Sequence, residues 1–108
     1  MTAGRHFDEV AVAVHAESVV IESRIAELAA ENQALRRKTS AARGQLTRAM
    51  RDGDAARIAE VHARLRDREA QEAATLDANI EEMQGLLQRG LSNLAELFGA
   101  WDEIEAGG

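Results

Sequence analysis

The chain has 108 residues and no proline, and its sequence contains one clear turn signal. Asp52, Gly53 and Asp54 supply turn chemistry, and Asp54 is a favourable N-cap for a helix that follows it. The stretches on both sides are rich in Ala, Glu, Arg, Leu and Gln, which are strong helix formers. We therefore expect an all-α chain with two helices and one turn. The expected ranges are about 6–50 for the first helix, 51–54 for the turn, 55–104 for the second helix, and 1–108 for the single domain.

The composition argues against most enzyme classes and cofactor sites. The chain has no Cys, Pro or Tyr, and its aromatic residues are two Phe and one Trp. Without cysteine it has no disulfide framework and no thiolate metal site. Surfaces rich in Ala and Arg do not line the deep apolar pockets that small molecules occupy. We therefore expect a non-enzymatic protein with no cofactor, no metal and no small-molecule substrate.

A heptad pattern runs through the first predicted helix. With Ile25 at an a position, the d positions are large and apolar; they are Phe7, Val14, Ile21, Leu28 and Leu35. The second predicted helix repeats less regularly. Its apolar residues from Leu76 onward are offset from the set that ends at Leu65, and this eleven-residue step predicts a stutter.

Folding back at Gly53 brings the two patterns together as an antiparallel, coiled-coil-like hairpin. Facing residues then have numbers that add to about 105, which pairs apolar residues along the hairpin. The expected pairs include Phe7 with Phe98, Val14 with Leu91 and Ile25 with Ile80, while Asn32 falls beside Ala73. The residues of this seam, through which the chain is also expected to self-associate, are Val14, Ile21, Ile25, Leu28, Asn32, Leu35, Leu76, Ile80, Met83 and Leu87.

A two-helix hairpin leaves part of its apolar surface in water. Helices normally cover such a stripe with a further helix, so we expect a homodimer that forms a four-helix bundle, or docking on another protein. The partner surface is predicted at Leu94, Phe98 and Trp101, near the end of the second helix. The expected function is that of an adaptor, chaperone or scaffold. With no cysteine, signal peptide or membrane-spanning stretch evident, we expect it in the cytoplasm.

The charges support an alternative function. Residues 36–68 hold ten cations and four acids, a net of +6, whereas the rest of the chain has three cations and fifteen acids, a net of −12. A basic tip at the turn could bind nucleic acid or an anionic membrane surface. The predicted tip residues are Arg36, Arg37, Lys38, Arg43, Arg48, Arg51, Arg57 and Arg64, in the basic segment that ends at Arg68.

Two structural alternatives remain open at this point. Asn32 at an a position between Leu28 and Leu35 is typical of a parallel leucine zipper, so a parallel oligomer centred on Asn32 is one alternative. The other is a strand, because residues 10–21 alternate and are rich in valine.

Overall fold

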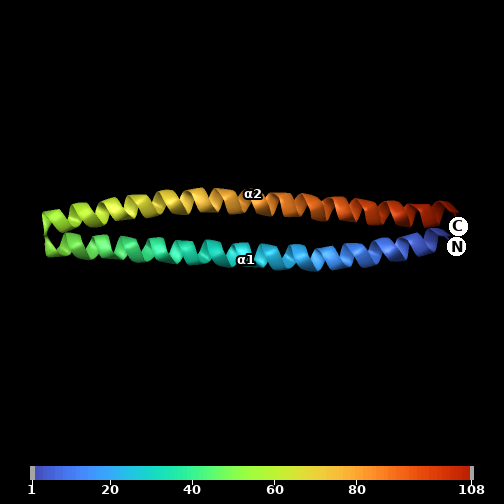
Figure 1. Ribbon diagram of the computed structural model, residues 1–108, viewed down its shortest axis with the longest axis horizontal. Coiled ribbons are helices and arrows are strands. Elements are labelled where there is room, and N and C mark those ends of the chain that lie inside the picture. Colours follow the sequence, from blue (N-terminus) through green and yellow to red (C-terminus); the bar gives the residue numbers. More distant parts are fainter. Residues whose placement is uncertain (1, 108) are drawn as a thin grey trace. The chain divides into compact units, whose positions relative to one another are not determined.

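A computed structural model describes residues 2–107 of the chain, and these residues form two helices (Figure 1). Helix α1 spans Thr2–Asp52 and helix α2 spans Ala55–Gly107. Residues 10–21 belong to α1, so the strand alternative is wrong. The alanine-rich, proline-free sequence has a high helix propensity. The preference of the valines in residues 10–21 for a strand does not outweigh it.

The turn between the helices is built from two adjacent caps. Gly53 has a φ of 76°, a left-handed conformation that glycine adopts without strain, and its N–H donates to the carbonyl oxygen of Ala49 at 3.1 Å. Asp54 Oδ1 accepts hydrogen bonds from the N–H groups of Ala56 at 3.0 Å and Arg57 at 3.2 Å. The glycine ends α1 and the aspartate starts α2, as the turn sequence predicts.

The chain divides into two compact units. The turn unit is Leu28–Glu81, and the terminal unit combines Met1–Glu27 with Glu82–Gly108. In the turn unit the chain reverses at Gly53 and the helices pack antiparallel, which is the predicted hairpin rather than a parallel zipper (Figure 1). In the terminal unit the first part of α1 lies beside the last part of α2. The single domain 1–108 and the four-helix bundle stay predictions.

The heptad positions predicted in α1 face α2. Ile21 and Leu28 are buried, and the other predicted seam residues of α1 are half-buried; these are Val14, Ile25, Asn32 and Leu35. Val10, which is not one of the predicted heptad positions, is also buried. Ala49 and Thr39 continue the buried side of α1 toward the turn. Large apolar side chains at regular spacing fixed this face of the helix.

The predicted pairing of α2 with α1 is wrong in part. Asn32 hydrogen-bonds Asn79 rather than lying beside Ala73, and the ring of Phe7 packs on Trp101, three residues beyond the expected Phe98. The predicted seam residues Leu76 and Met83 are half-buried, but Ile80 and Leu87 are exposed, as is Leu91, the expected partner of Val14.

The physical reason is that α2 carries polar residues at seam positions. Leu65 and Asn79 are buried and Glu72 between them is half-buried, so a seven-residue spacing continues where a stutter was predicted. Glu72 and Asn79 are not apolar, so a prediction based on hydrophobic spacing does not include them in the seam. It places a neighbouring apolar residue such as Ile80 there instead.

Candidate functional site

The terminal unit carries an exposed apolar stripe on α2. It consists of Leu87, Leu91, Leu94, Phe98 and Trp101, which we call the α2 stripe. The five side chains are between 44% and 63% exposed. Their spacing alternates between four and three residues, which places them on one face of the helix. The predicted partner residues Leu94, Phe98 and Trp101 all belong to this stripe.

Each residue of the α2 stripe directly follows, in the sequence, a buried or half-buried residue of the seam with α1. Leu86 and Ala100 are buried toward α1, and the residues that follow them, Leu87 and Trp101, are exposed. One residue corresponds to a rotation of about 100° around an α-helix. The stripe therefore faces sideways from the contact with α1, in the direction that a further helix occupies in a bundle.

Trp101 is held in place by two contacts. Its ring packs edge-on against Phe7 of α1, with 5.4 Å between the ring centroids and 65° between the planes. Its Nε1 donates to Glu105 Oε1 at 2.9 Å. Together with Leu97 and Phe98, the two rings line an apolar depression. The indole N–H is thus satisfied while much of the ring remains available to a partner.

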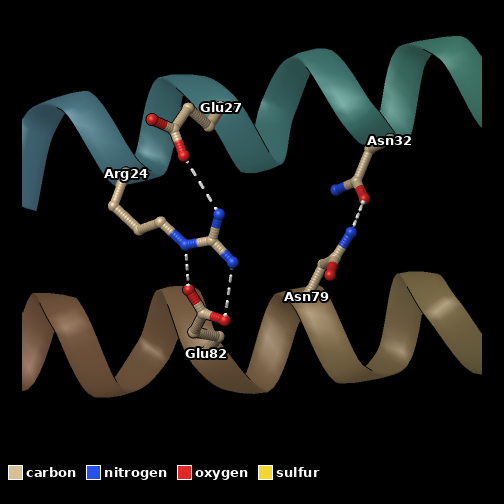
Figure 2. A network of polar contacts seen from close by, with 5 residues as sticks. All are labelled: Arg24, Glu27, Asn32, Asn79 and Glu82. Atoms are coloured by element: carbon tan, nitrogen blue, oxygen red, sulfur yellow. Dashed lines mark hydrogen bonds and ion pairs between the residues drawn. The ribbon is translucent and has the colours of Figure 1, made fainter.

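The opposite flank of α2 pairs its charges with α1. Arg24 Nε donates to Glu82 Oε2 at 2.5 Å, a second guanidinium nitrogen reaches Oε1 at 3.1 Å, and a third reaches Glu27 at 3.0 Å (Figure 2). Arg24 thereby lowers the pKa of Glu82, while its bonds to Glu82 and then Glu27 raise the pKa of Arg24. These side chains form a polar clamp between the two helices.

A second clamp lies on the same flank. Glu17 accepts hydrogen bonds from Arg89 and, at 2.9 Å, from Asn93 Nδ2. Both hydrogen bonds lower the pKa of Glu17, and the bond from Arg89 has the larger effect. Glu82 and Arg89 each precede a half-buried seam position by one residue, whereas the residues of the α2 stripe follow one. One flank of the terminal unit is therefore ion-paired and the other is apolar.

The predicted basic tip lies in the turn unit, and all eight of its residues are exposed. Arg64 pairs with Glu60, and Arg43 lies 3.8 Å from Glu69. No other tip residue has a carboxylate partner among residues 2–107. Arg48, Arg57 and Arg64 line one depression, which Asp52 and Glu60 also border.

Sequence reasoning missed Leu87 and Leu91 as members of the α2 stripe, because it placed both in the contact with α1. A usable signal was present: between residues 86 and 101, each seam position is followed by a large apolar residue. No protein-family model, curated protein or solved structure matches the chain. Within residues 2–107, neither helix has a stretch apolar enough to cross a membrane, and no three His, Asp or Glu side chains cluster as metal ligands do.

Proposed function

We propose that this chain is a non-enzymatic protein–protein interaction module of the adaptor, chaperone or scaffold class, which self-associates through the α2 stripe. The observation that supports this proposal is the alternating four-and-three spacing of five exposed apolar residues. Such a row is the pattern of a helix–helix contact, and it lies beside the buried seam with α1, which it meets where Trp101 packs on Phe7. The cysteine-free sequence suits a reducing compartment, so a cytoplasmic location is part of the proposal.

Sedimentation velocity across micromolar concentrations tests self-association. We expect a dimer that dissociates on dilution, and we expect Leu94→Glu to raise the dimer dissociation constant by about a hundredfold, because the change places a charge at the centre of the apolar contact.

Val20→Glu is the matched control for this experiment. Val20 is an exposed apolar residue of α1 outside the stripe, so the same change in charge should leave the dimer intact. A wild-type protein that sediments as a compact monomer would contradict the proposed self-association. Equal effects of the two variants would contradict the role of the stripe.

The basic tip supports a second candidate function, namely binding of a phosphate-rich polyanion. Six of its eight cations have no carboxylate partner among the described residues, so their charge is available to a ligand. The polyanion could be DNA, RNA or an anionic membrane. Gel shifts with duplex DNA and with RNA, and flotation with anionic vesicles, each repeated at rising salt, distinguish these ligands. Binding through the tip should weaken steeply with salt and should be lost with Arg48→Gln and Arg57→Gln together. Retention at high salt would argue against this function.

A further inference from the structure

We propose that the occupant of the α2 stripe is a second copy of this chain whose own α2 runs antiparallel, with the two-fold axis close to Leu94. This inference rests on the proposed self-association and specifies its geometry. Leu87 and Trp101 lie seven residues on either side of Leu94, and Leu91 and Phe98 lie three and four residues away. An antiparallel copy therefore places Leu87 opposite Trp101 and Leu91 opposite Phe98 across the axis.

A depression on α2 lies where this arrangement needs one. Gln84, Gly85, Leu87, Gln88 and Leu91 line it. In the antiparallel pairing it lies opposite Trp101 of the second copy, which enters it as a knob enters a hole. A Cβ added at Gly85 meets nothing within 4 Å in its own chain, so packing with α1 does not require a glycine there. Glycine destabilises a helix by about 1 kcal/mol relative to alanine. At position 85 its lack of a side chain leaves space for the Trp101 ring of the second copy.

The charges of the terminal unit favour the antiparallel direction over the parallel one. This unit has three arginines against ten carboxylates, a formal charge of −7, and each arginine is paired with a glutamate of its own chain. A parallel copy would set the acidic end at Asp102, Glu103 and Glu105 beside its own duplicate. An antiparallel copy moves that end about 25 Å along the partner helix, well beyond the ~8 Å screening length at physiological salt. There the three acidic residues fall opposite residues 83–86, which are uncharged, next to Glu82, whose charge Arg24 already pairs within its own chain.

The exposed area of the stripe reaches the lower limit for a specific contact. The five exposed side chains of the stripe present on the order of 500 Å² per copy, and two copies together reach the ~1,000 Å² that a specific interface requires. Phe7 and Glu105 already hold Trp101 in place, so little side-chain freedom is lost when it docks.

Spin-label distances in single-cysteine variants of the full chain test the geometry, because the natural sequence has no cysteine. Ala95 and Asp102 are exposed positions for the labels. In the antiparallel dimer the two labels are separated along the helix axis by about 3 Å at position 95 and about 24 Å at position 102. Equal separations at the two positions would show a parallel dimer and overturn the inference while leaving self-association standing. The absence of any dimer in sedimentation would instead overturn the proposed function and this inference together.

Filling the depression provides a test that does not depend on labels. Gly85→Leu should raise the dimer dissociation constant by about tenfold or more, because the new side chain occupies the space for Trp101. Gly44→Leu is the matched control, since an added Cβ at Gly44 also meets nothing within 4 Å but lies in the turn unit. Unchanged dimerisation of the Gly85 variant would show that no ring enters this depression.

Discussion

Asn79 donates a hydrogen bond from Nδ2 to Oδ1 of Asn32 at 2.7 Å, and the two residues join the helices of the turn unit at a seam position (Figure 2). Asn79 is buried and Asn32 is half-buried. A buried polar pair stabilises less than an apolar pair of similar size, but it disfavours every register in which either amide lacks its partner. The pair therefore contributes to fixing the alignment of α2 on α1.

The Asn32–Asn79 pair should show strong coupling in a double-mutant cycle. Asn79→Leu alone should lower the free energy of unfolding by roughly 1 kcal/mol, because the Asn32 amide loses its partner inside the seam. The double variant with Asn32→Leu should be at least as stable as the wild type, since neither amide remains. Urea unfolding of the four proteins measures this, and simple additivity of the two single changes would contradict it.

Thr39 offers a stabilising substitution. Its side chain is 1% exposed, and its Oγ1 has no hydrogen-bond partner among the described residues. Thr39→Val removes the unsatisfied hydroxyl and keeps the branched shape, so we expect the free energy of unfolding to rise by about 1 kcal/mol. Thr47→Val is the control, because Thr47 is exposed and its Oγ1 donates to the Arg43 carbonyl oxygen. A Thr39 variant that is less stable than the wild type would refute the expectation.

Alanine at two glycines should have opposite effects. Gly53→Ala forces a side chain into the left-handed conformation at the turn and should destabilise the protein by about 1 kcal/mol. Gly44→Ala lies inside α1, where an added Cβ has open space, and should stabilise by up to ~1 kcal/mol. Thermal unfolding followed by circular dichroism measures both variants. Shifts of the same sign would contradict this account of the turn.

The Arg24–Glu82 clamp makes part of the stability depend on pH. The folded state lowers the pKa of Glu82 from its ordinary value of 4.5, so this stabilisation is present above that value and is lost as the pH falls through the lowered one. Glu82→Gln should therefore destabilise the protein more at pH 7 than at pH 3 when urea midpoints are compared. Glu31→Gln, at an exposed position of α1, is the control. An equal loss at both pH values would show that the carboxylate charge does not contribute.

The outcome for α1 shows how far a regular pattern can be trusted. Phe7, Val14, Ile21, Leu28 and Leu35 recur every seven residues, and each is buried or half-buried. The Gly53–Asp54 turn could also be predicted from the sequence. The left-handed conformation at Gly53 and the N-cap at Asp54 depend only on the local backbone.

The same reasoning selected the wrong face of α2 at several positions. Ile80 follows the buried Asn79 and Leu87 follows the buried Leu86, and in both cases the prediction took the exposed residue instead of the buried one before it. Hydrophobicity alone does not distinguish a helix face that packs within the chain from one that awaits a partner.

The sequence by itself determined the two helices, the turn and the buried face of α1, because backbone propensity, capping and a strong heptad are local properties. Only the tertiary structure decided the register of α2 and the position of its exposed stripe. Those depend on contacts between distant residues, such as Asn32 with Asn79 and Arg24 with Glu82, whose geometry no local pattern contains.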